Sequence, residues 1–239
     1  MLGLGNSITS GYIPFTLTSV SDLELWLQNG VGVTAAKWND SSGNSNHATQ
    51  ATEGNQAAVS GGGLDFEADN SDHYDLASSI SISQNGGFCM AIVFTRESST
   101  AQAIFSDSSN EQLSLQGGGT TFRLKSNDPG NITTDAVFAS GTFPLATKMI
   151  FLVNRSAGAS NRFTFFKNGV ALTADIDTST NEAVGENPNG FDFDTLGASI
   201  SGSGNFFDGI IHEVAFWSKG LSATEIADVN SYLKNVHGL

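Results

Sequence analysis

The sequence predicts an all-β fold in which two antiparallel sheets pack as a sandwich and a short C-terminal α-helix covers one of them. The 239 residues include 27 glycines and only 4 prolines, which is typical of many short strands joined by turns. Seventeen phenylalanines and a hydrophobic content of 39% supply the core of a single domain. The last quarter of the chain contains a strand that is apolar on both faces and runs directly into a capped helix.

Residues 1–20 are predicted to form an extension outside the sandwich. They are polar and glycine-rich, and Pro14 argues against a central strand in this stretch. Such a segment suits an assembly or docking arm, so the folded domain is expected to cover residues 21–239. We expect removal of residues 1–20 to leave a folded sandwich and to abolish assembly.

The first strand is expected at residues 23–27, where leucines alternate with polar residues and with Trp26. Trp26 then lies on the face opposite to the leucines. It is either covered by the C-terminal helix or the N-terminal extension, or exposed as a platform for a sugar or a neighbouring subunit. A second short strand ends at Trp38. Both Trp26 and Trp38 are candidate ligand-binding residues.

The loop at residues 39–47 is the stretch of the chain richest in side-chain oxygens. Short oxygen-bearing side chains around a glycine can bind Ca²⁺. Asx turns in a tight loop require the same residues, so both interpretations stay open. The order of residues is not that of an EF-hand. The candidate ligands of a structural calcium ion are Asp40, Asn44 and, from the closing strand, Glu213.

Further strands are expected where apolar residues alternate or run together. These are residues 64–67, 73–76, 88–95, 101–106, 111–116, 120–125, 134–139, 148–153, 162–167 and 170–172, with another beginning at 191. The two that flank Asn168-Gly169 are predicted to form a hairpin with a type I′ turn. Cys89 lies inside an apolar strand, which predicts a buried and unreactive thiol. Residues 127–130 read as a turn and residues 181–189 as a polar loop.

The closing strand, residues 206–217, carries apolar residues of both parities, so it is expected to be covered on both faces. Strict alternation groups Ile210, Val214 and Phe216 with His212, and Ile211, Ala215 and Trp217 with Glu213. One polar residue must therefore point inward and find a hydrogen-bond or ion-pair partner, or Glu213 reaches the loop at Asp40 and shares a calcium ion there.

The C-terminal helix is predicted over residues 222–236. Ser222 and Glu225 form a capping box, and Leu221 with Ile226 forms a hydrophobic staple. The helical spacing of Ile226, Val229, Leu233 and Val236 predicts one apolar stripe that docks on a sheet.

Asp192 and Asp194 are the pair of carboxylates most suited to ligand contact. Residues at i and i+2 of a strand share one face. Glycoside hydrolysis also uses two carboxylates, but no longer run of alternating acids accompanies this pair. A solvated face is therefore favoured over a catalytic pair, and both aspartates remain candidate ligand-binding residues.

Charge and composition exclude several classes of protein. The formal net charge is −14 and the pI is about 4.4, which argues against binding to a nucleic-acid backbone. No stretch approaches the eighteen apolar residues of a membrane span, and the N-terminus lacks the pattern of a secretion signal. The four histidines show no metal-ligand spacing, so zinc is not indicated.

Both ends of the chain resemble one family. The stretch Leu196-Gly197-Ala198, the pattern Phe207-x-Gly209-x-Ile211-x-Glu213 and the segment Trp217 to Ile226 are similar to the C-terminal signature of concanavalin A-like, laminin-G-like jelly rolls. Leu23 to Leu27, Trp38 to Thr49 and Leu64 to Phe66 resemble that family's opening strands. The resemblance implies a jelly-roll sandwich, a fold that hosts lectins, glycosidases, adhesion modules and virus structural parts.

Residues 1–8 resemble the start of small structural proteins of tailed phages. We therefore expect a non-enzymatic virion structural or decoration protein, located in a capsid or tail and assembled in the host cytoplasm. Its expected partners are other virion proteins, further copies of itself and host-surface glycans. The alternative is a calcium-dependent carbohydrate-binding module, and a glycoside hydrolase is the less favoured third reading.

Overall fold

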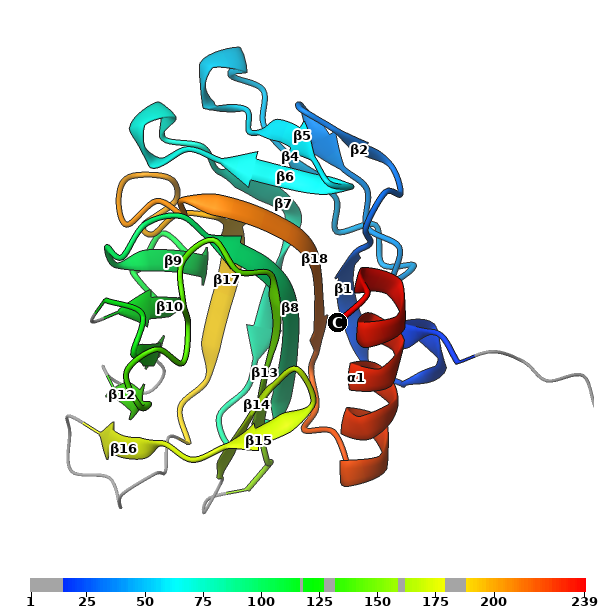
Figure 1. Cartoon of the computed structure of the whole chain (residues 1–239), viewed down its shortest axis with the longest axis vertical. Helices are drawn as coiled ribbons and strands as arrows, with labels where there is room; N and C mark the ends of the chain where they lie inside the picture. The colour runs from blue at the N-terminus through cyan, green and yellow to red at the C-terminus, as the bar shows by residue number, and fades with distance from the viewer. Residues whose placement is uncertain (1–14, 117, 127–131, 159–161, 179–187) are drawn as a thin grey trace, which may run out of the picture.

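The computed structural model describes residues 15–116, 118–126, 132–158, 162–178 and 188–239. These residues form two antiparallel sheets that pack face to face, and one α-helix, α1 (Ala223–His237), lies against the outer face of one sheet (Figure 1). The predicted turn at 127–130 and most of the predicted loop at 181–189 lie outside the described residues. The sandwich itself is confirmed.

Sheet A has the order β15-β14-β13-β8-β18-β6-β5, and β1 also pairs with β18. Its strands are β1 (Leu23–Leu27), β5 (Ala58–Ser60), β6 (Gly63–Phe66), β8 (Phe88–Arg96), β13 (Met149–Arg155), β14 (Phe163–Lys167), β15 (Val170–Leu172) and β18 (Gly209–Trp217). The closing strand β18 therefore lies inside the sheet, as its two apolar faces predict.

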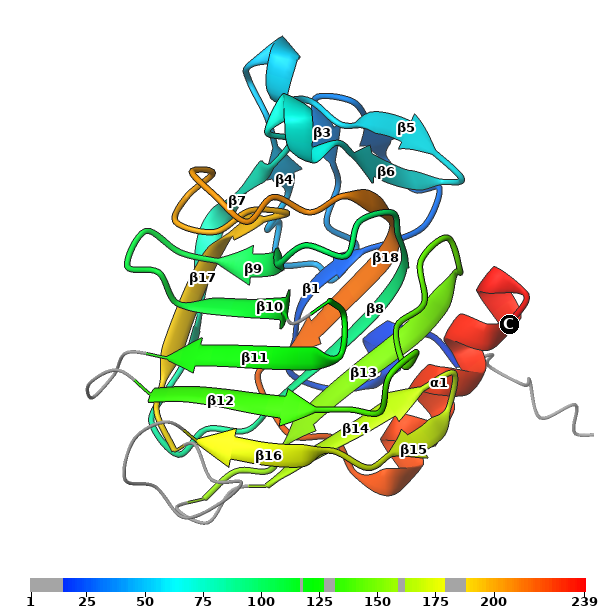
Figure 2. The ribbon, with the colours of Figure 1, turned by 60° about the vertical axis from the view of Figure 1, so that its left-hand side comes forward.

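Sheet B has the order β16-β12-β11-β10-β9-β17-β7-β4-β3-β2 (Figure 2). Its strands are β2 (Val33–Thr34), β3 (Lys37–Trp38), β4 (Ala48–Thr49), β7 (Tyr74–Ile82), β9 (Gln102–Ser106), β10 (Gln112–Gln116), β11 (Thr121–Ser126), β12 (Ile132–Val137), β16 (Asp175–Thr178) and β17 (Phe191–Leu196). Three short 3-10 helices are η1 (Leu17–Ser19), η2 (Glu53–Asn55) and η3 (Ala68–Asn70).

Sheet A is apolar on both sides because it separates two hydrophobic clusters. The larger cluster fills the space between the sheets and contains most of the buried phenylalanines, among them Phe88, Phe151 and Phe216. The second lies between sheet A and α1 and includes Cys89, Trp217 and Leu233. The buried thiol of Cys89 is confirmed, and burial raises its pKa well above the usual value.

The faces predicted for β18 need a correction. The pairing of β18 with β8 shifts between Ile211 and Glu213, which marks a β-bulge at His212. Beyond the bulge, Val214 and Phe216 lie between the sheets with Ile211, and not with Ile210 as strict alternation predicts. Glu213 lies on the α1 side, because one extra residue inverts the parity of the strand.

A second irregularity corrects the prediction for β1. The register shifts between Leu23 and Leu25, so Leu25 and Leu27 lie between the sheets while Leu23 joins Trp26 under α1. The three leucines therefore do not share one face. The covered position of Trp26, one of the two alternatives, is the one observed.

Residues 15–20 belong to the folded domain. Leu17 is completely buried, Val20 is 4% exposed, and both lie in the cluster under α1. Residues 15–20 therefore do not belong to the extension predicted over residues 1–20, and truncation at residue 20 would remove two core side chains. The rest of that extension lies outside the described residues.

The helix termini follow their local signals closely. Ser222 is the N-cap, its side chain accepts from the Glu225 amide, and the Glu225 side chain accepts in return from the Ser222 amide. The chain leaves the helix at Gly238 in the left-handed conformation. The Lys219 ammonium, with the Ser222 amide, holds the pKa of the Glu225 carboxyl at about 2.

Candidate functional site

The predicted calcium ligand Asp40 is occupied by protein donors. Its Oδ1 accepts from the amides of Trp26 (2.9 Å) and Ser42 (2.8 Å), and its Oδ2 accepts from the Ser42 hydroxyl (2.7 Å) and the Asn46 amide (2.9 Å). The Asn44 amide group donates to the Leu23 carbonyl at 2.7 Å. This is the Asx-turn interpretation, in which the carboxylate organises the loop and has no free oxygen for a metal ion.

Glu213 lies in a different environment, beneath α1. It is 1% exposed; Oε1 accepts from the Trp26 indole at 2.7 Å, and Oε2 is 2.8 Å from Nε2 of His237. Glu213 thus finds the inward partner that a buried carboxylate needs. In this structure the carboxylates of Asp40 and Glu213 are bound to different protein donors and do not meet, so the calcium set of Asp40, Asn44 and Glu213 stays a prediction.

The two candidate ligand-binding tryptophans, Trp26 and Trp38, are both buried. Trp38 is completely buried and donates its indole N–H to the Gln28 carbonyl at 3.0 Å. Trp26 is 5% exposed and lies edge-to-face with Tyr232 of α1, with ring centroids 6.1 Å apart. Both rings therefore belong to the core, and for Trp26 the covered alternative is the one observed.

Asp192 and Asp194 lie together on the outer face of β17, as predicted. Asp192 is exposed and Asp194 is half-buried, whereas Phe191 and Phe193 between and beside them point into the core. The Asp194 carboxylate accepts from the Thr195 hydroxyl at 3.0 Å. These side chains lie on the strand that joins β7 to β9 in sheet B.

The neighbouring strands extend this polar surface. Glu111, just before β10, is 5% exposed, and its Oε2 accepts from the amide of Asp192 at 2.7 Å. Gln112 is 7% exposed, and its Oε1 finds no hydrogen-bond donor among the described residues. Pairing places Gln112 opposite Ser106, which in turn lies opposite Thr195. We call Ser106, Glu111, Gln112, Asp192, Asp194 and Thr195 the polar face.

The polar face continues across β11 and β12. Arg123 donates two parallel hydrogen bonds of 2.7 Å to Asp135, and this half-exposed pair raises the pKa of Arg123. Sequence reasoning missed Glu111, Gln112, Arg123 and Asp135. The alternation of polar and apolar residues in Gln112 to Gln116 is the signal that could have placed them on an outer face.

A separate acidic cluster lies at the end of sheet A. Asp65, Glu67 and Glu97 bring carboxylate oxygens within 4.8 Å of one another, the one such group found among the described residues. Burial, and then repulsion from neighbouring acids, raises the pKa of Asp65, Glu67 and Asp208. The sequence did not point to this cluster, because Glu97 is about 30 residues away from Asp65 and Glu67 along the chain.

His212, at the bulge of β18, is a buried histidine with a strongly lowered pKa. It is 7% exposed and lies 3.0 Å from the Thr95 hydroxyl. Burial, followed by the charges of Lys148 and His237, lowers its pKa to about 4. The folded state therefore favours the neutral imidazole, since the unfolded pKa is about 6.5.

We expect His212→Gln to flatten the acid side of the stability profile. The stabilisation from the neutral imidazole is complete above about pH 6.5 and is lost as the pH falls towards about 4, with a slope of at most about 1.4 kcal/mol per pH unit. Urea unfolding at several pH values across this window measures the slope. His73→Gln serves as the control, and equal slopes in both variants would contradict the assignment.

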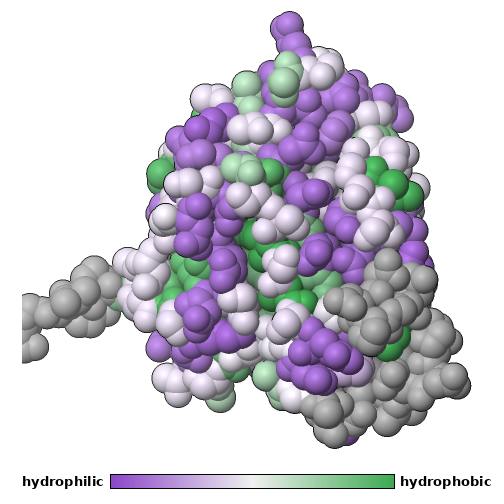
Figure 3. All heavy atoms as spheres, turned by 180° about the vertical axis from the view of Figure 1, so that it is seen from behind, coloured by the Kyte–Doolittle hydropathy of each residue, from purple (hydrophilic) through white to green (hydrophobic). Residues whose placement is uncertain are grey.

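The surface is mostly hydrophilic on the side opposite to Figure 1, and hydrophobic residues gather near its middle (Figure 3). Among the described residues no helix has the length and hydropathy needed to cross a bilayer.

Comparison with known proteins agrees with the fold. The profile of the concanavalin A-like lectin/glucanases superfamily (Laminin_G_3) matches residues 68–227, which is more than half of the chain. The chain belongs to this superfamily. No curated protein matches it. Because the concanavalin A-like fold hosts both lectins and enzymes, membership settles the architecture and leaves the function to the site.

Solved structures show the same sandwich at low identity. The binding domain of Paraclostridial Mosquitocidal Protein 1 aligns with a TM-score of 0.62 and 14% identity, over 92% of this chain and 54% of that one. A Trypanosoma rangeli sialidase complex aligns at 0.55 and 14%, over 91% and 33%. Domain 4 of an extracellular arabinanase from Geobacillus stearothermophilus, bound to arabinotriose, aligns at 0.52 and 17%, over 87% and 98%.

The chain thus spans a third to about half of the length of the sialidase and mosquitocidal protein structures. At these identities the likeness concerns the fold alone.

Proposed function

We propose that this chain is a non-enzymatic carbohydrate-binding module whose polar face recognises sugar hydroxyl groups. The observation that carries the proposal is the buried Gln112 carbonyl oxygen, which has no donor among the described residues and belongs to the same polar face as the exposed Asp192 and half-buried Asp194. A buried acceptor without a partner costs about 1–3 kcal/mol, and a ligand hydroxyl would remove this penalty.

The chemistry of the polar face suits sugars. Carboxylates and amides are planar groups that accept or donate in two directions, so one side chain can bind neighbouring hydroxyls. Glu111 fixes the backbone of Asp192, which holds the β17 aspartates in place. The carbohydrate ligands of structural neighbours, such as the arabinotriose of the arabinanase domain, support sugar as the ligand class.

A binding role is favoured over hydrolysis. A glycosidase needs one carboxyl group with a raised pKa to protonate the leaving oxygen, close to a second carboxylate. The carboxyl groups whose raised pKa is described above, Asp65, Glu67 and Asp208, belong to the end of sheet A and not to the polar face. We therefore propose recognition without bond cleavage.

A glycan array tests this proposal. We expect the wild-type chain to bind a defined set of glycans, and the double variant Asp192→Asn/Asp194→Asn to lose at least about tenfold in affinity, about 1.4 kcal/mol. Asp228→Asn, an exposed change on α1, is the matched control. Absence of any glycan binding, or equal binding by the double variant, would overturn the proposal.

The same array should be probed with added Ca²⁺ and with EDTA. Because the Asp40 loop has no free carboxylate oxygen, we expect the two conditions to give equal binding. A loss in EDTA would show that calcium dependence, the alternative expected from the sequence, is correct and resides at other ligands.

We further propose that the module works on a tailed-phage virion, docked on capsid or tail proteins. The resemblance of residues 1–8 to phage structural proteins and the acidic net charge of −14, which disfavours nucleic-acid binding, support this setting. Peptide mass spectrometry of purified particles should find the chain in stoichiometric amounts. Its absence from the particles would leave the carbohydrate-binding module without a virion role.

A further inference from the structure

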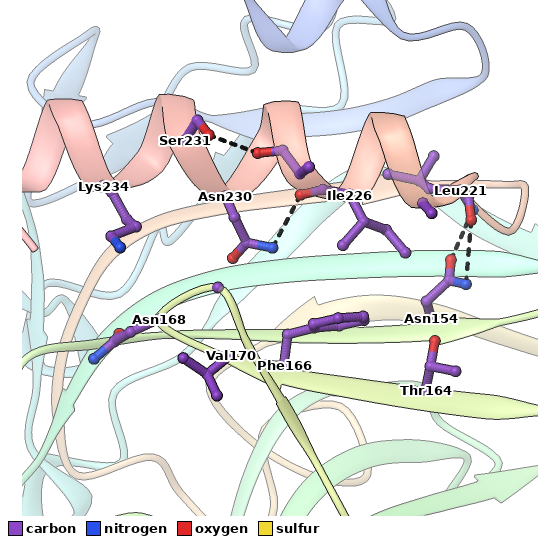
Figure 4. A pocket seen from close by; sticks show the side chains of 13 residues that line it. Asn154, Thr164, Phe166, Asn168, Val170, Leu221, Ile226, Asn230, Ser231 and Lys234 are labelled. Carbon is purple, nitrogen blue, oxygen red and sulfur yellow. Dashed lines mark hydrogen bonds between the residues drawn. The ribbon is translucent and has the colours of Figure 1, made fainter.

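A groove of about 560 Å³ runs between α1 and the β13–β15 region of sheet A (Figure 4). Its lining consists of Asn154, Thr164, Phe166, Asn168, Gly169, Val170, Leu221, Ala223, Ile226, Ala227, Asn230, Ser231 and Lys234. The floor comes from β14 and the wall from the helix. The groove is distinct from the polar face, which lies on the other sheet.

The groove is predominantly apolar and exposes side chains that would gain from cover. Phe166 is only half-buried on its floor, and Val170 is 68% exposed beside it. Ile226 lines the helix side (Figure 4). An uncovered strip of this kind, framed by polar residues, is typical of a surface that binds a partner.

Asn230 gives the groove a specific polar requirement. Its Nδ2 donates to the Ile226 carbonyl at 2.9 Å, but its Oδ1 is buried and finds no donor among the described residues. Asn230 is 4% exposed and points from α1 towards the floor (Figure 4). An occupant with a backbone N–H would satisfy this oxygen.

The charge of the groove restricts the occupant. Lys234 is the one ionisable side chain in the lining, and no carboxylate takes part. The chain carries −14 overall, so a charged acidic segment of another copy would be repelled by the surrounding surface. An uncharged apolar segment meets no such barrier.

We infer that the groove binds residues 1–14 of a second copy of this chain. This segment has no charged side chain and contains apolar residues at intervals, namely Leu2, Leu4, Ile8, Tyr12 and Ile13. Its backbone amides supply the donors that the Asn230 oxygen lacks. Fourteen extended residues span at most roughly 45–50 Å, which is enough to reach across to a neighbouring molecule.

The starting point of the segment favours a neighbour over its own groove. Phe15 packs edge-to-face on Tyr232 with ring centroids 6.3 Å apart, on the flank of α1 opposite to Asn230. To reach its own groove, the segment would cross the exposed ridge of α1, where Thr224 and Asp228 are polar. The segment of a second copy can enter the groove from solvent, so its leucines need not cross the polar ridge.

The experiment measures the molar mass of the chain in solution and the binding of a peptide to it. Light scattering should show the full chain self-associating and the variant that lacks residues 1–14 as a monomer. That variant keeps all of the described residues, and circular dichroism checks its fold. A labelled peptide of residues 1–14 should bind it saturably in fluorescence anisotropy, and a peptide with serine at positions 2, 4 and 8 should not.

Two helix variants locate the binding site. In the truncated chain, Ala227→Arg fills the groove from an exposed helix position. We expect it to lower the affinity for the peptide by about tenfold or more. Thr224→Arg places the same charge on the exposed ridge and should leave binding unchanged. Equal binding by both variants, or no peptide binding, would overturn the inference. Binding by the truncated chain combined with a monomeric full chain would also overturn it, because the segment would then fill its own groove.

Discussion

Replacing Glu213 by alanine is expected to lower the free energy of unfolding by about 3–5 kcal/mol. The carboxylate joins two distant parts of the fold, since it accepts from the Trp26 indole of β1 and contacts His237 in the last turn of α1. Removal leaves both nitrogens in a closed space without an acceptor. Urea unfolding at neutral pH measures the change.

Two further variants separate the contributions at this site. Glu213→Gln keeps an acceptor for the indole and is expected to recover part of the loss. Glu53→Ala removes an exposed glutamate from η2 and is expected to change stability by less than about 0.5 kcal/mol. If Glu213→Ala behaved like Glu53→Ala, the buried hydrogen bonds would contribute no net stability.

Replacing Arg155 by alanine is expected to cost about 3–4 kcal/mol. This completely buried side chain donates to the Gly86 carbonyl from Nε and Nη2 (3.1 and 2.7 Å) and to the Asn189 carbonyl from Nη1 (3.0 Å). Its guanidinium lies over the rings of Phe88 and Phe191 at 5.0 and 5.4 Å. Burial lowers its pKa to about 10.

Substitution can separate the contribution of the buried volume of Arg155 to stability from the contribution of its hydrogen bonds. Arg155→Met restores much of the buried volume but none of the donors, and we expect it to cost about half as much as alanine. Arg123→Ala, which breaks a half-exposed ion pair with Asp135, should cost less than about 1 kcal/mol. A loss for Arg155→Ala as small as that for Arg123→Ala would contradict the argument.

The elements that local sequence determines were predictable. The capping box of α1 and the Asn168-Gly169 turn, in which both residues have positive φ, depend on neighbours within a few positions. The two-sided burial of β18 was also predictable, because the strand has apolar residues at both odd and even positions. Short strands such as β5 and β16 were missed, since they carry few apolar residues and exist through pairing with longer neighbours.

The candidate site was predictable only in part. Asp192 and Asp194 share a face because they are two residues apart on one strand, and the structure confirms that placement. The partners of Glu213 come from β1 and from the helix, about 187 and 24 residues away, and no local pattern reveals them. Both interpretations of the Asp40 loop stayed open in the sequence, because a turn-forming and a metal-binding aspartate look alike until their donors are known.

The bulge at His212 bears on how roles are transferred between homologues. A gapless alignment of β18 with a relative that lacks the extra residue is in the correct register on one side of the bulge only. On the other side, it assigns core positions to helix-facing residues and helix-facing positions to core residues. Glu213 would then be read as a sandwich-core or ligand-facing acid, although here it fastens α1 to β1. Comparative annotation of this strand therefore requires superposed backbones.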